Sequence, residues 1–427
     1  MTDATQAGAF PSGRPGTHSR DLVRASLGKR KSAQTRLKIY GGVAIAFALL
    51  MLATLIGSVV STSLPAWTRT EVKLDVAIPA EDDINYNSLA NNSLLAMFPE
   101  TDGRAERRAV TGILSNGAQF MLRDLVAADP QLKGQTTSVW VPVSDPYEQL
   151  FEGVVNADQA EANRRLDDAA LARFKQLEEA GLIRSAVDWG LVTEADSRFP
   201  ELAGLKGAII GSFFLLLVCF LISVPVGVGA AVYLEEFAPK NRFTDFIEIN
   251  INNLAAVPSI VFGLLGLALF IGVFGLPRSV PLVGGMVLSL MTLPTIIIVT
   301  RNALKAVPPS IREAARGVGA SEMQVIGHHV LPLALPGILT GVIIGLAQAL
   351  GEAAPLLLIG MNAFITSAPS GPLDPSTALP TQIFIWFDSP ERGFVARTSA
   401  AICVLLAFLS IMNLTAVLLR RRLERRW

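Results

Sequence analysis

The sequence predicts an all-helical integral membrane protein with six transmembrane helices and a mixed α/β domain inserted between the first two. Three observations support this fold class. Apolar residues make up 51% of the 427 residues, and the mean hydropathy is +0.46. Six windows carry almost no ionisable side chain, and each has the roughly 20 residues that cross a hydrocarbon core as a helix. A long polar stretch separates the first two windows and has the alternation of a soluble domain.

The charges near the ends of these windows predict their orientation, because Lys and Arg close to a span stay in the cytoplasm. Eight Lys and Arg residues precede the first window, and the chain ends in a run of arginines. An even number of spans returns the C-terminus to the side of the N-terminus, so both are predicted to be cytoplasmic. The six predicted spans are 40–64, 207–233, 249–274, 280–300, 335–361 and 398–419.

The domain boundaries follow from these spans. The first span begins too late and is too long for a cleaved signal peptide, so we expect it to be retained. The preceding residues have few large apolar side chains, which predicts a flexible tail. The predicted divisions are a basic cytoplasmic tail (1–38), transmembrane helix 1 (39–64), a periplasmic insertion (65–206), a domain with the other five spans (207–419) and a basic cytoplasmic C-terminus (420–427).

The insertion is predicted to contain strands and amphipathic helices. Apolar and polar residues alternate over 72–78, the pattern of a half-buried strand. A second strand at 139–143 contains Pro142, which confines it to a sheet edge. Apolar residues at helical spacing predict helices over 110–125, with an interruption at Gly117, and over 166–177.

No catalytic group of residues is recognisable in the insertion, which lacks histidine and cysteine. Four carboxylates near the second helix raise the alternative of a metal site. A solvated helix face is the favoured interpretation, because runs of charge on helices are usually exposed. The four residues are Asp167, Asp168, Glu178 and Glu179.

A polar stretch at 308–332, between the fourth and fifth spans, carries its own folding signals and is called here the 308–332 loop. Ser310 precedes Glu313 by three residues, and Ser321 precedes Gln324 by three, which predicts two capped short helices. Adjacent prolines at the start of the loop stop the preceding helix. Two glycines supply the flexible backbone of the turn between the helices: Gly317 and Gly319.

The residues of this loop resemble the EAA loop of permease subunits in binding-protein-dependent ABC importers. The match consists of Glu-Ala-Ala at 313–315, a glycine at 319 and Leu-Pro at 331–332, although His329 stands where the family pattern has isoleucine. In that family the loop inserts into a cleft of the ATPase, and the alternative is an ordinary cytoplasmic loop. The resemblance implies ATPase coupling by Arg312, Glu313, Ala314, Ala315, Gly319, Leu331 and Pro332.

Four further stretches resemble the PstA-type permease of the phosphate importer, with its type I importer permease fold. With the 308–332 loop they cover nearly everything from Gly207 onward. Gln348 is a departure, because the family often has arginine there. The four stretches are VGAAVYLEEFAPKNRF at 228–243, AVPSIVFGLLGLALF at 256–270, LGEAAPLLLIG at 350–360 and LPTQIFIWF at 379–387.

This resemblance implies a set of partners in the bacterial inner membrane. They are a PstC-type permease in a heterodimer, a PstB-type ATPase dimer that holds ATP and Mg²⁺, and a PstS-type periplasmic phosphate-binding protein. The chain has no Gly-x-x-x-x-Gly-Lys-Ser/Thr sequence, so we expect it to bind no cofactor and not to be an enzyme. Its basic tails are explained by membrane topology and not by nucleic acid. Two alternatives remain open: a permease for another oxyanion, such as molybdate or sulfate, and a membrane-anchored periplasmic sensor.

Glu352 is the foremost pathway candidate, because a carboxylate in a span costs about 2.5–3.5 kcal/mol and is usually functional. An ionised Glu352 repels an anionic cargo, so we expect it to pair with an arginine, either Arg301 or one from the partner permease, as a gate or latch. A purely structural ion pair is the alternative. Arg301 itself either neutralises a passing anion or snorkels to the interface. The other pathway candidates are polar residues of the kinked spans: Gln348, Ser259, Asn253 and Thr295.

Overall fold

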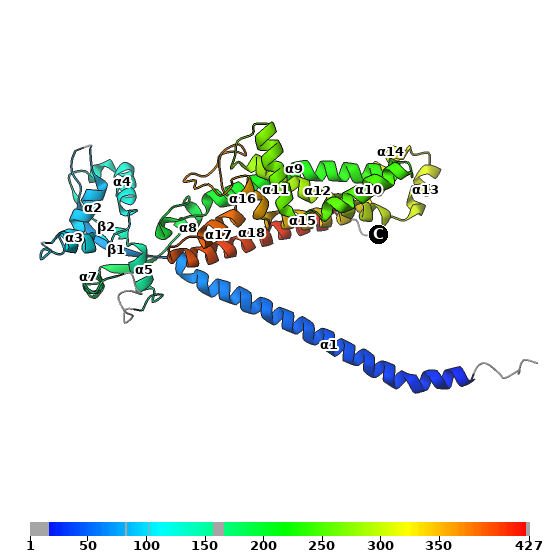
Figure 1. Cartoon of the computed structure of the whole chain (residues 1–427), viewed down its shortest axis with the longest axis horizontal. Helices are drawn as coiled ribbons and strands as arrows, with labels where there is room; N and C mark the ends of the chain where they lie inside the picture. Colours follow the sequence, from blue (N-terminus) through cyan, green and yellow to red (C-terminus); the bar gives the residue numbers. More distant parts are fainter. Residues whose placement is uncertain (1–16, 82, 102, 157–165, 424–427) are drawn as a thin grey trace, which may run out of the picture. The chain divides into compact units, whose positions relative to one another are not determined.

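The computed structural model describes residues 17–81, 83–101, 103–156 and 166–423. The chain divides into two compact units, Met1–Ser58 and Val59–Trp427. The first unit consists of most of helix α1, Thr17–Ser63 (Figure 1). The predicted flexible tail is therefore wrong for residues 17–38, where Leu, Ala, Arg and Lys favour helix. Residues 1–16 of the predicted tail lie outside the described residues.

The insertion in the second unit is built on a three-stranded antiparallel sheet of order β2-β1-β3 (Figure 1). β1 (Thr68–Ala77) is central and pairs with β2 (Thr136–Pro142) and β3 (Ile183–Val187). Both predicted strands are confirmed, including the edge position of β2. β3 was not predicted, because five residues that include Arg184 and Ser185 give too little apolar alternation.

Helices cover the apolar face of the sheet, where Val72, Leu74 and Val76 are fully buried. The predicted helix over 110–125 is two helices, and the predicted interruption at Gly117 is confirmed, because Gly117 directly precedes the second helix. A Cβ at Gly117 would lie 2.7 Å from a methyl carbon of Leu202. The described helices are α2 (Tyr86–Leu95), α3 (Arg104–Thr111), α4 (Ala118–Ala128), α5 (Asp145–Phe151), α7 (Asp168–Glu179) and α8 (Gly190–Thr193). Short 3₁₀ turns are η1 (Leu64–Trp67), η2 (Pro130–Leu132) and η3 (Pro200–Leu202).

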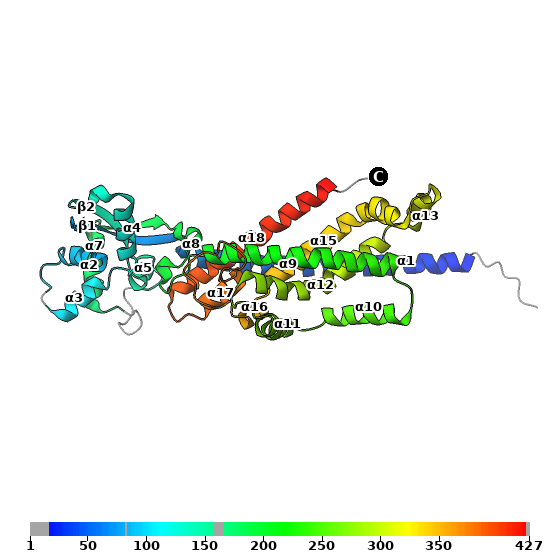
Figure 2. The same cartoon turned by 90° about the horizontal axis from the view of Figure 1, so that it is seen from above.

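The described residues contain five helices that are long and apolar enough to cross a membrane, or six if a bent pair counts as one span. In addition to α1 they are α9 (Lys206–Val232), extended by the π-helix η4 (Tyr233–Phe237), α12 (Pro281–Lys305), α15 (Leu331–Leu350) and α18 (Gly393–Leu423). α12 packs along both α9 and α15 (Figure 2). The protein is therefore a mostly helical, multi-pass membrane protein.

The third span is not the single kinked helix that the sequence predicts. α10 (Arg242–Ala255) and α11 (Ser259–Gly266), which continues as the π-helix η5 (Leu267–Val273), meet at 99° (Figure 2). Pro258 causes the break, because it lacks an N–H donor and restricts the residue before it. This pair forms either a broken span or a re-entrant loop.

The fifth predicted span also differs from the structure. The fifth span ends at Leu350 and not at residue 361; a turn then leads into α16 (Ala354–Leu358). In α17 (Leu379–Phe387), Leu379 and Trp386 are buried against neighbouring helices. The indole N–H of Trp386 donates a 2.9 Å hydrogen bond to Asp196, a tertiary partner that the local sequence does not reveal.

A buried ion pair joins the insertion to the start of α18. The guanidinium of Arg397 donates to Asp188 Oδ2 at 2.7 Å and to the carbonyl oxygen of Ala203 at 3.3 Å. Arg397 and Asp188 are 3% and 2% exposed. A cavity of about 210 Å³ beside this pair is lined by three carboxylates from α5 and its end: Asp145, Glu148 and Glu152.

The insertion and the 308–332 loop lie at opposite ends of α9. With η4 this helix has 32 residues, which corresponds to about 48 Å and exceeds the thickness of a bilayer core. The insertion precedes Lys206 at one end, and the 308–332 loop contacts η4 at the other. Both views place α13 (Pro309–Gly317) of this loop and α17 at opposite ends of the helical bundle (Figures 1 and 2).

Candidate functional site

The 308–332 loop folds as two short helices joined by a turn, as predicted. α13 (Pro309–Gly317) is followed by a turn at Gly319, whose φ of +89° requires glycine, and by α14 (Glu322–Gln324). The π-helix η6 (Val325–Val330) then leads directly into α15. The loop thus connects α12 to α15 through short helices, with non-helical breaks before α13 and between α13 and α14.

The predicted capping box at Ser321 is confirmed, and the one at Ser310 is wrong. The Ser321 N–H donates to Gln324 Oε1 at 2.9 Å, and the Gln324 N–H donates to Ser321 Oγ at 3.4 Å. At the first helix, Pro308 occupies the N-cap position and no side chain caps the helix. Prolines fit at the start of a helix, where the N–H groups have no helical partner, so α13 begins before Ser310.

One face of α13 packs on the membrane helices and the other is exposed. Ala315 is buried, while Glu313 and Ala314 are exposed, as is Gly319 in the turn. Leu331 and Pro332 are half-buried at the start of α15. Of the predicted coupling residues, the structure therefore presents Glu313, Ala314 and Gly319 on the accessible side.

Two exposed apolar residues of the 308–332 loop were missed by the sequence analysis. Val318 is 85% exposed and Met323 is 70% exposed, on either side of the Gly319 turn. The sequence signal for these two residues was a large apolar side chain in a polar turn. Large apolar side chains are usually buried, so an exposed one indicates a contact surface. They give the end of the 308–332 loop an apolar tip.

Arg312 points away from this accessible side. Its Nη2 donates to Glu236 Oε1 at 2.7 Å and to the carbonyl oxygen of Leu304 at 3.0 Å. Its Nη1 donates to the carbonyl oxygen of Val307 at 2.7 Å, and its side chain is only 16% exposed. The structure thus places Arg312 between the loop and the membrane helices and not on the outer surface of the loop.

Arg301 belongs to the same charged cluster, at the end of α12. It donates to Glu248 at 2.6 Å and to Glu235 at 3.3 Å, and Lys305 lies 3.5 Å from Glu235. With Glu236 and Arg312 included, the cluster contains three carboxylates and three cations, so its formal charges balance. They are Glu235, Glu236 and Glu248, and Arg301, Lys305 and Arg312. The sequence analysis did not predict that these glutamates pair with the basic residues. The available signal was the acidic pair Glu235–Glu236 at the end of one apolar span and the basic residues Arg301 and Lys305 at the end of another.

The predicted pair between Glu352 and Arg301 is wrong, because Arg301 is held by Glu235 and Glu248. The register of α12 and α15 explains why. Glu352 follows the end of α15 and is level with about residue 289 of α12, which is about 18 Å from Arg301 along the helix axis. This register comes from three contacts: Gly337 with Ala303, Gly341 with Val299 and Gly345 with Ile296.

Glu352 is half-buried and has no ion-pair partner within the described part of the chain. The alternative partner, an arginine of the partner permease, stays a prediction. Glu352 lies in the turn between α15 and α16, where its backbone N–H donates to the carbonyl oxygen of Ala349 at 3.2 Å. A carboxylate in a non-helical turn at membrane depth requires protein or water around it.

The other pathway candidates fall in two places. Asn253 is exposed near the end of α10, and Ser259 is half-buried at the start of α11, so both flank the 99° break. Thr295 is half-buried in α12, and the exposed Gln348 lies within about one turn of it in height on α15. Among the described residues no side-chain hydrogen bond joins these four to one another or to Glu352.

The four carboxylates considered for a metal site in the insertion are exposed, as the favoured interpretation of a solvated helix face predicts. Asp167 caps α7, where its side chain accepts the N–H of Ala170. Within the described residues, no group of three or more His, Cys, Asp or Glu side chains is arranged to hold a metal ion.

Two family models match this sequence. The model described as "Binding-protein-dependent transport system inner membrane component" matches residues 223–427. A second, described as "Domain of unknown function (DUF3333)", matches residues 24–161, which include most of α1 and much of the insertion.

Curated relatives match about half of this chain. The "Phosphate transport system permease protein PstA" of Haemophilus influenzae is 32% identical over 230 residues, which cover 54% of this chain and 80% of the relative. The "Probable ABC transporter permease protein YqgI" of Bacillus subtilis is 29% identical over 248 residues, which cover 54% of this chain and 83% of the relative.

Among solved structures, the MetNI methionine ABC transporter in an inward-facing conformation aligns with 52% of this chain and 95% of its own. The identity is 19% and the TM-score is 0.41. The sequence relatives therefore carry the assignment. The chain belongs to the family of PstA-type permease subunits of binding-protein-dependent ABC transporters, non-catalytic membrane subunits that work with a separate ATPase chain and a substrate-binding protein.

Proposed function

We propose that this chain is one permease of an ATP-driven phosphate importer and forms half of its translocation pathway with a PstC-type permease. A PstS-type protein delivers phosphate to the outer face, and a PstB-type ATPase dimer drives transport through the 308–332 loop. The names of the relatives support phosphate as the cargo. Membership in the permease family removes the alternative of a sensor without a transport role.

The observation that carries the coupling proposal is the exposed Glu313–Ala314 face of α13, backed by the buried Ala315. This face lies at the end of the helical bundle that is opposite to the insertion (Figure 1). We place the 308–332 loop and both termini in the cytoplasm, beside the ATPase, and the insertion (65–206) in the periplasm. The exposed apolar side chains of Val318 and Met323 extend the docking surface.

The test is ATP hydrolysis by the reconstituted complex of both permeases and the ATPase, with the binding protein added in its phosphate-loaded or empty form. Stimulation by the phosphate-loaded form is the expected result. Stimulation only by a molybdate- or sulfate-loaded protein would keep the permease role and replace the cargo. Equal hydrolysis under all conditions would contradict an importer role.

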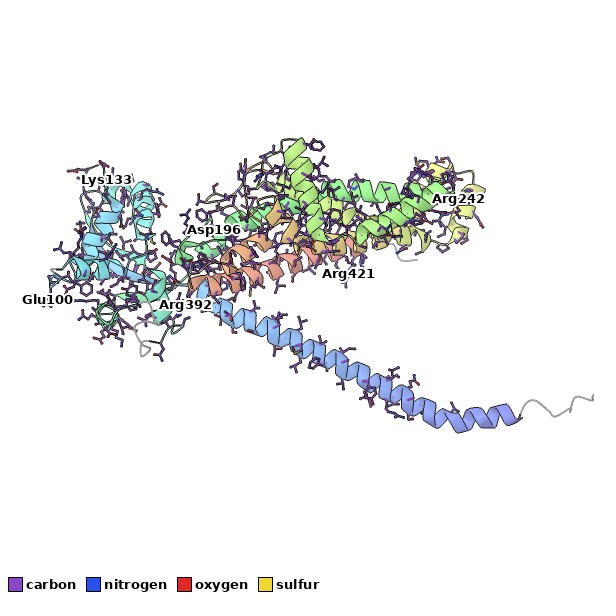
Figure 3. The ribbon with its side chains drawn as sticks, in the orientation of Figure 1. Glu100, Lys133, Asp196, Arg242, Arg392 and Arg421 are labelled. Atoms are coloured by element: carbon purple, nitrogen blue, oxygen red, sulfur yellow. The ribbon has the colours of Figure 1, made fainter. Side chains whose placement is uncertain are left out.

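Glu313→Arg, which reverses the charge of this residue, is expected to abolish ATP-driven uptake of phosphate. Glu313 is exposed on the proposed docking face, where a reversed charge costs several kcal/mol against a complementary partner surface. Uptake and hydrolysis are measured in the same vesicles. The matched control is Glu100→Arg, on the exposed surface of the insertion (Figure 3), which should leave uptake unchanged. Normal uptake by the Glu313 variant would remove this residue from coupling.

We also propose that Glu352 acts as a gate or interface latch. Its half-buried carboxylate at the α15–α16 turn has no partner in the described chain, which leaves it available to the partner permease. Glu352→Gln keeps the shape and removes the charge, and should lower phosphate uptake by about tenfold, equivalent to about 1.4 kcal/mol. Copurification of the four-subunit complex checks assembly. Unchanged uptake with normal assembly would exclude Glu352 from the mechanism.

A further inference from the structure

The last turn of α9 holds two other elements through two adjacent glutamates. Glu235 and Glu236 lie on the π-helix η4, and their side chains diverge. Glu235 contacts Arg301 and Lys305 of α12, while Glu236 contacts Arg312 of α13. One turn of helix thus binds both a membrane span and the 308–332 loop.

The Glu236–Arg312 pair is short, two-pronged and shielded. Arg312 Nη2 lies 2.7 Å from Glu236 Oε1, and Arg312 Nε lies 3.3 Å from Glu236 Oε2. The two side chains are 16% and 10% exposed. Paired hydrogen bonds of this kind fix orientation as well as distance, and shielding from water strengthens them.

Arg312 also closes the end of α12. Its guanidinium donates hydrogen bonds to the carbonyl oxygens of Leu304 and Val307, at 3.0 Å and 2.7 Å. The last carbonyls of a helix have no partner in the helix, and a cation is favourable there. A single side chain of α13 therefore connects the ends of both α9 and α12.

The apolar contact of α13 with the same helices is non-directional. Ala315 is buried in it and Ile311 is half-buried against it, and apolar contacts of this kind fix no angle between the helices. The guanidinium contacts do not permit sliding, because each fixes an angle and a distance. Movement of α13 must therefore displace the ends of α9 and α12 or break these bonds.

We propose that Arg312 and Glu236 are positioning residues for coupling: their ion pair transmits displacement of the 308–332 loop to α9 and α12. This inference rests on the proposed ATPase docking of that loop. In this arrangement Arg312 lies on the membrane side of the loop. Glu313 contacts the ATPase, and its neighbour Arg312 transmits the displacement of the loop to Glu236.

The test compares Arg312→Gln and Glu236→Gln with wild type in the complex with the partner permease and the PstB-type ATPase. Hydrogen exchange at the backbone amides of α13 and η4 is followed without nucleotide and after trapping with ATP and vanadate. In wild type, trapping should change exchange in both α13 and η4. In the variants the change in α13 should remain and the change in η4 should be lost, with phosphate uptake per ATP lowered by about tenfold.

Two further variants separate coupling from stability. Arg316→Gln breaks a similarly short pair, 2.8 Å to Glu322, that is exposed and internal to the loop, so it should leave the η4 response unchanged. Exchanging the charges, with Glu236→Arg and Arg312→Glu together, should restore part of the response. An η4 response that persists in Arg312→Gln, or equal loss in Arg316→Gln, would overturn the proposal.

Failure of the proposed function gives a different result. If wild type responds to vanadate trapping but not to phosphate-loaded binding protein, the cargo is wrong and the positioning role stands. If wild type does not copurify with the ATPase, the docking proposal fails, and the positioning role fails with it. If wild type binds the ATPase but α13 alone responds to trapping, only the positioning role is overturned.

Discussion

Replacing Arg397 by methionine is expected to destabilise the joint between the insertion and α18 by about 3–5 kcal/mol. The substitution leaves Asp188 charged and 2% exposed, without its 2.7 Å partner. It also removes the donor to the Ala203 carbonyl oxygen. Asp188 keeps the Gly190 N–H at 3.0 Å and a longer contact of 3.8 Å to Arg69, but it loses its short, hydrogen-bonded ion pair in a buried position, so the loss should be large.

The matched control is Arg123→Met, which breaks an exposed ion pair in the same insertion. Arg123 and Asp124 are 2.9 Å apart, with side chains 57% and 69% exposed, so the expected loss is about 0–1 kcal/mol. Urea unfolding of the purified complex, followed by tryptophan fluorescence, measures both variants. Equal shifts of the unfolding midpoint would contradict a structural role for the Arg397–Asp188 pair.

The stability of the insertion is expected to fall as pH rises, and Glu148 should be the main cause. Burial raises the pKa of Glu148 to about 8, against opposing effects of Arg397 and the Thr70 N–H, while Glu152 and Glu201 raise it further. Folding therefore favours the protonated carboxyl. This contribution is fully present below the unfolded pKa of 4.5 and is lost as pH rises through about 8.

The measurement is the urea midpoint of wild type and Glu148→Gln at several pH values across this window. Glutamine cannot ionise, so the variant should be more stable than wild type near pH 8 and should show a smaller slope. A residual slope of the same sign is expected, because burial also raises the pKa of Glu152 and Glu201. Identical slopes in the two proteins would contradict the buried carboxyl as the source.

Local sequence determined the features that depend on neighbouring residues. Apolar windows of sufficient length predicted helices α9, α12, α15 and α18, because no other element satisfies the backbone in a membrane. Period-two alternation predicted β1. Prolines at 308–309 and the glycine at 319 predicted the shape of the 308–332 loop, because they act on their own backbone angles.

Local sequence did not predict the ion-pair partners of Arg301 and Arg312, because the tertiary structure brings these partners together from distant parts of the chain. Arg301 pairs with Glu235 and Glu248, which are 66 and 53 residues away, and not with the predicted Glu352. Arg312 reaches Glu236, 76 residues away, and so turns inward from the loop that it was expected to present to the ATPase.

The same limit applies to burial. The apolar run of α17 suits either a membrane surface or a protein interior, and only its contacts decided for the interior. Ser212 of α9 accepts the Leu379 N–H at 2.8 Å, and Asp196 accepts the Trp386 indole, across 167 and 190 residues. Sequence thus determined which segments become helices and where they turn, because those depend on local backbone preference. The tertiary structure decided which charges meet and which faces are buried, because those depend on the register of helices far apart in the chain.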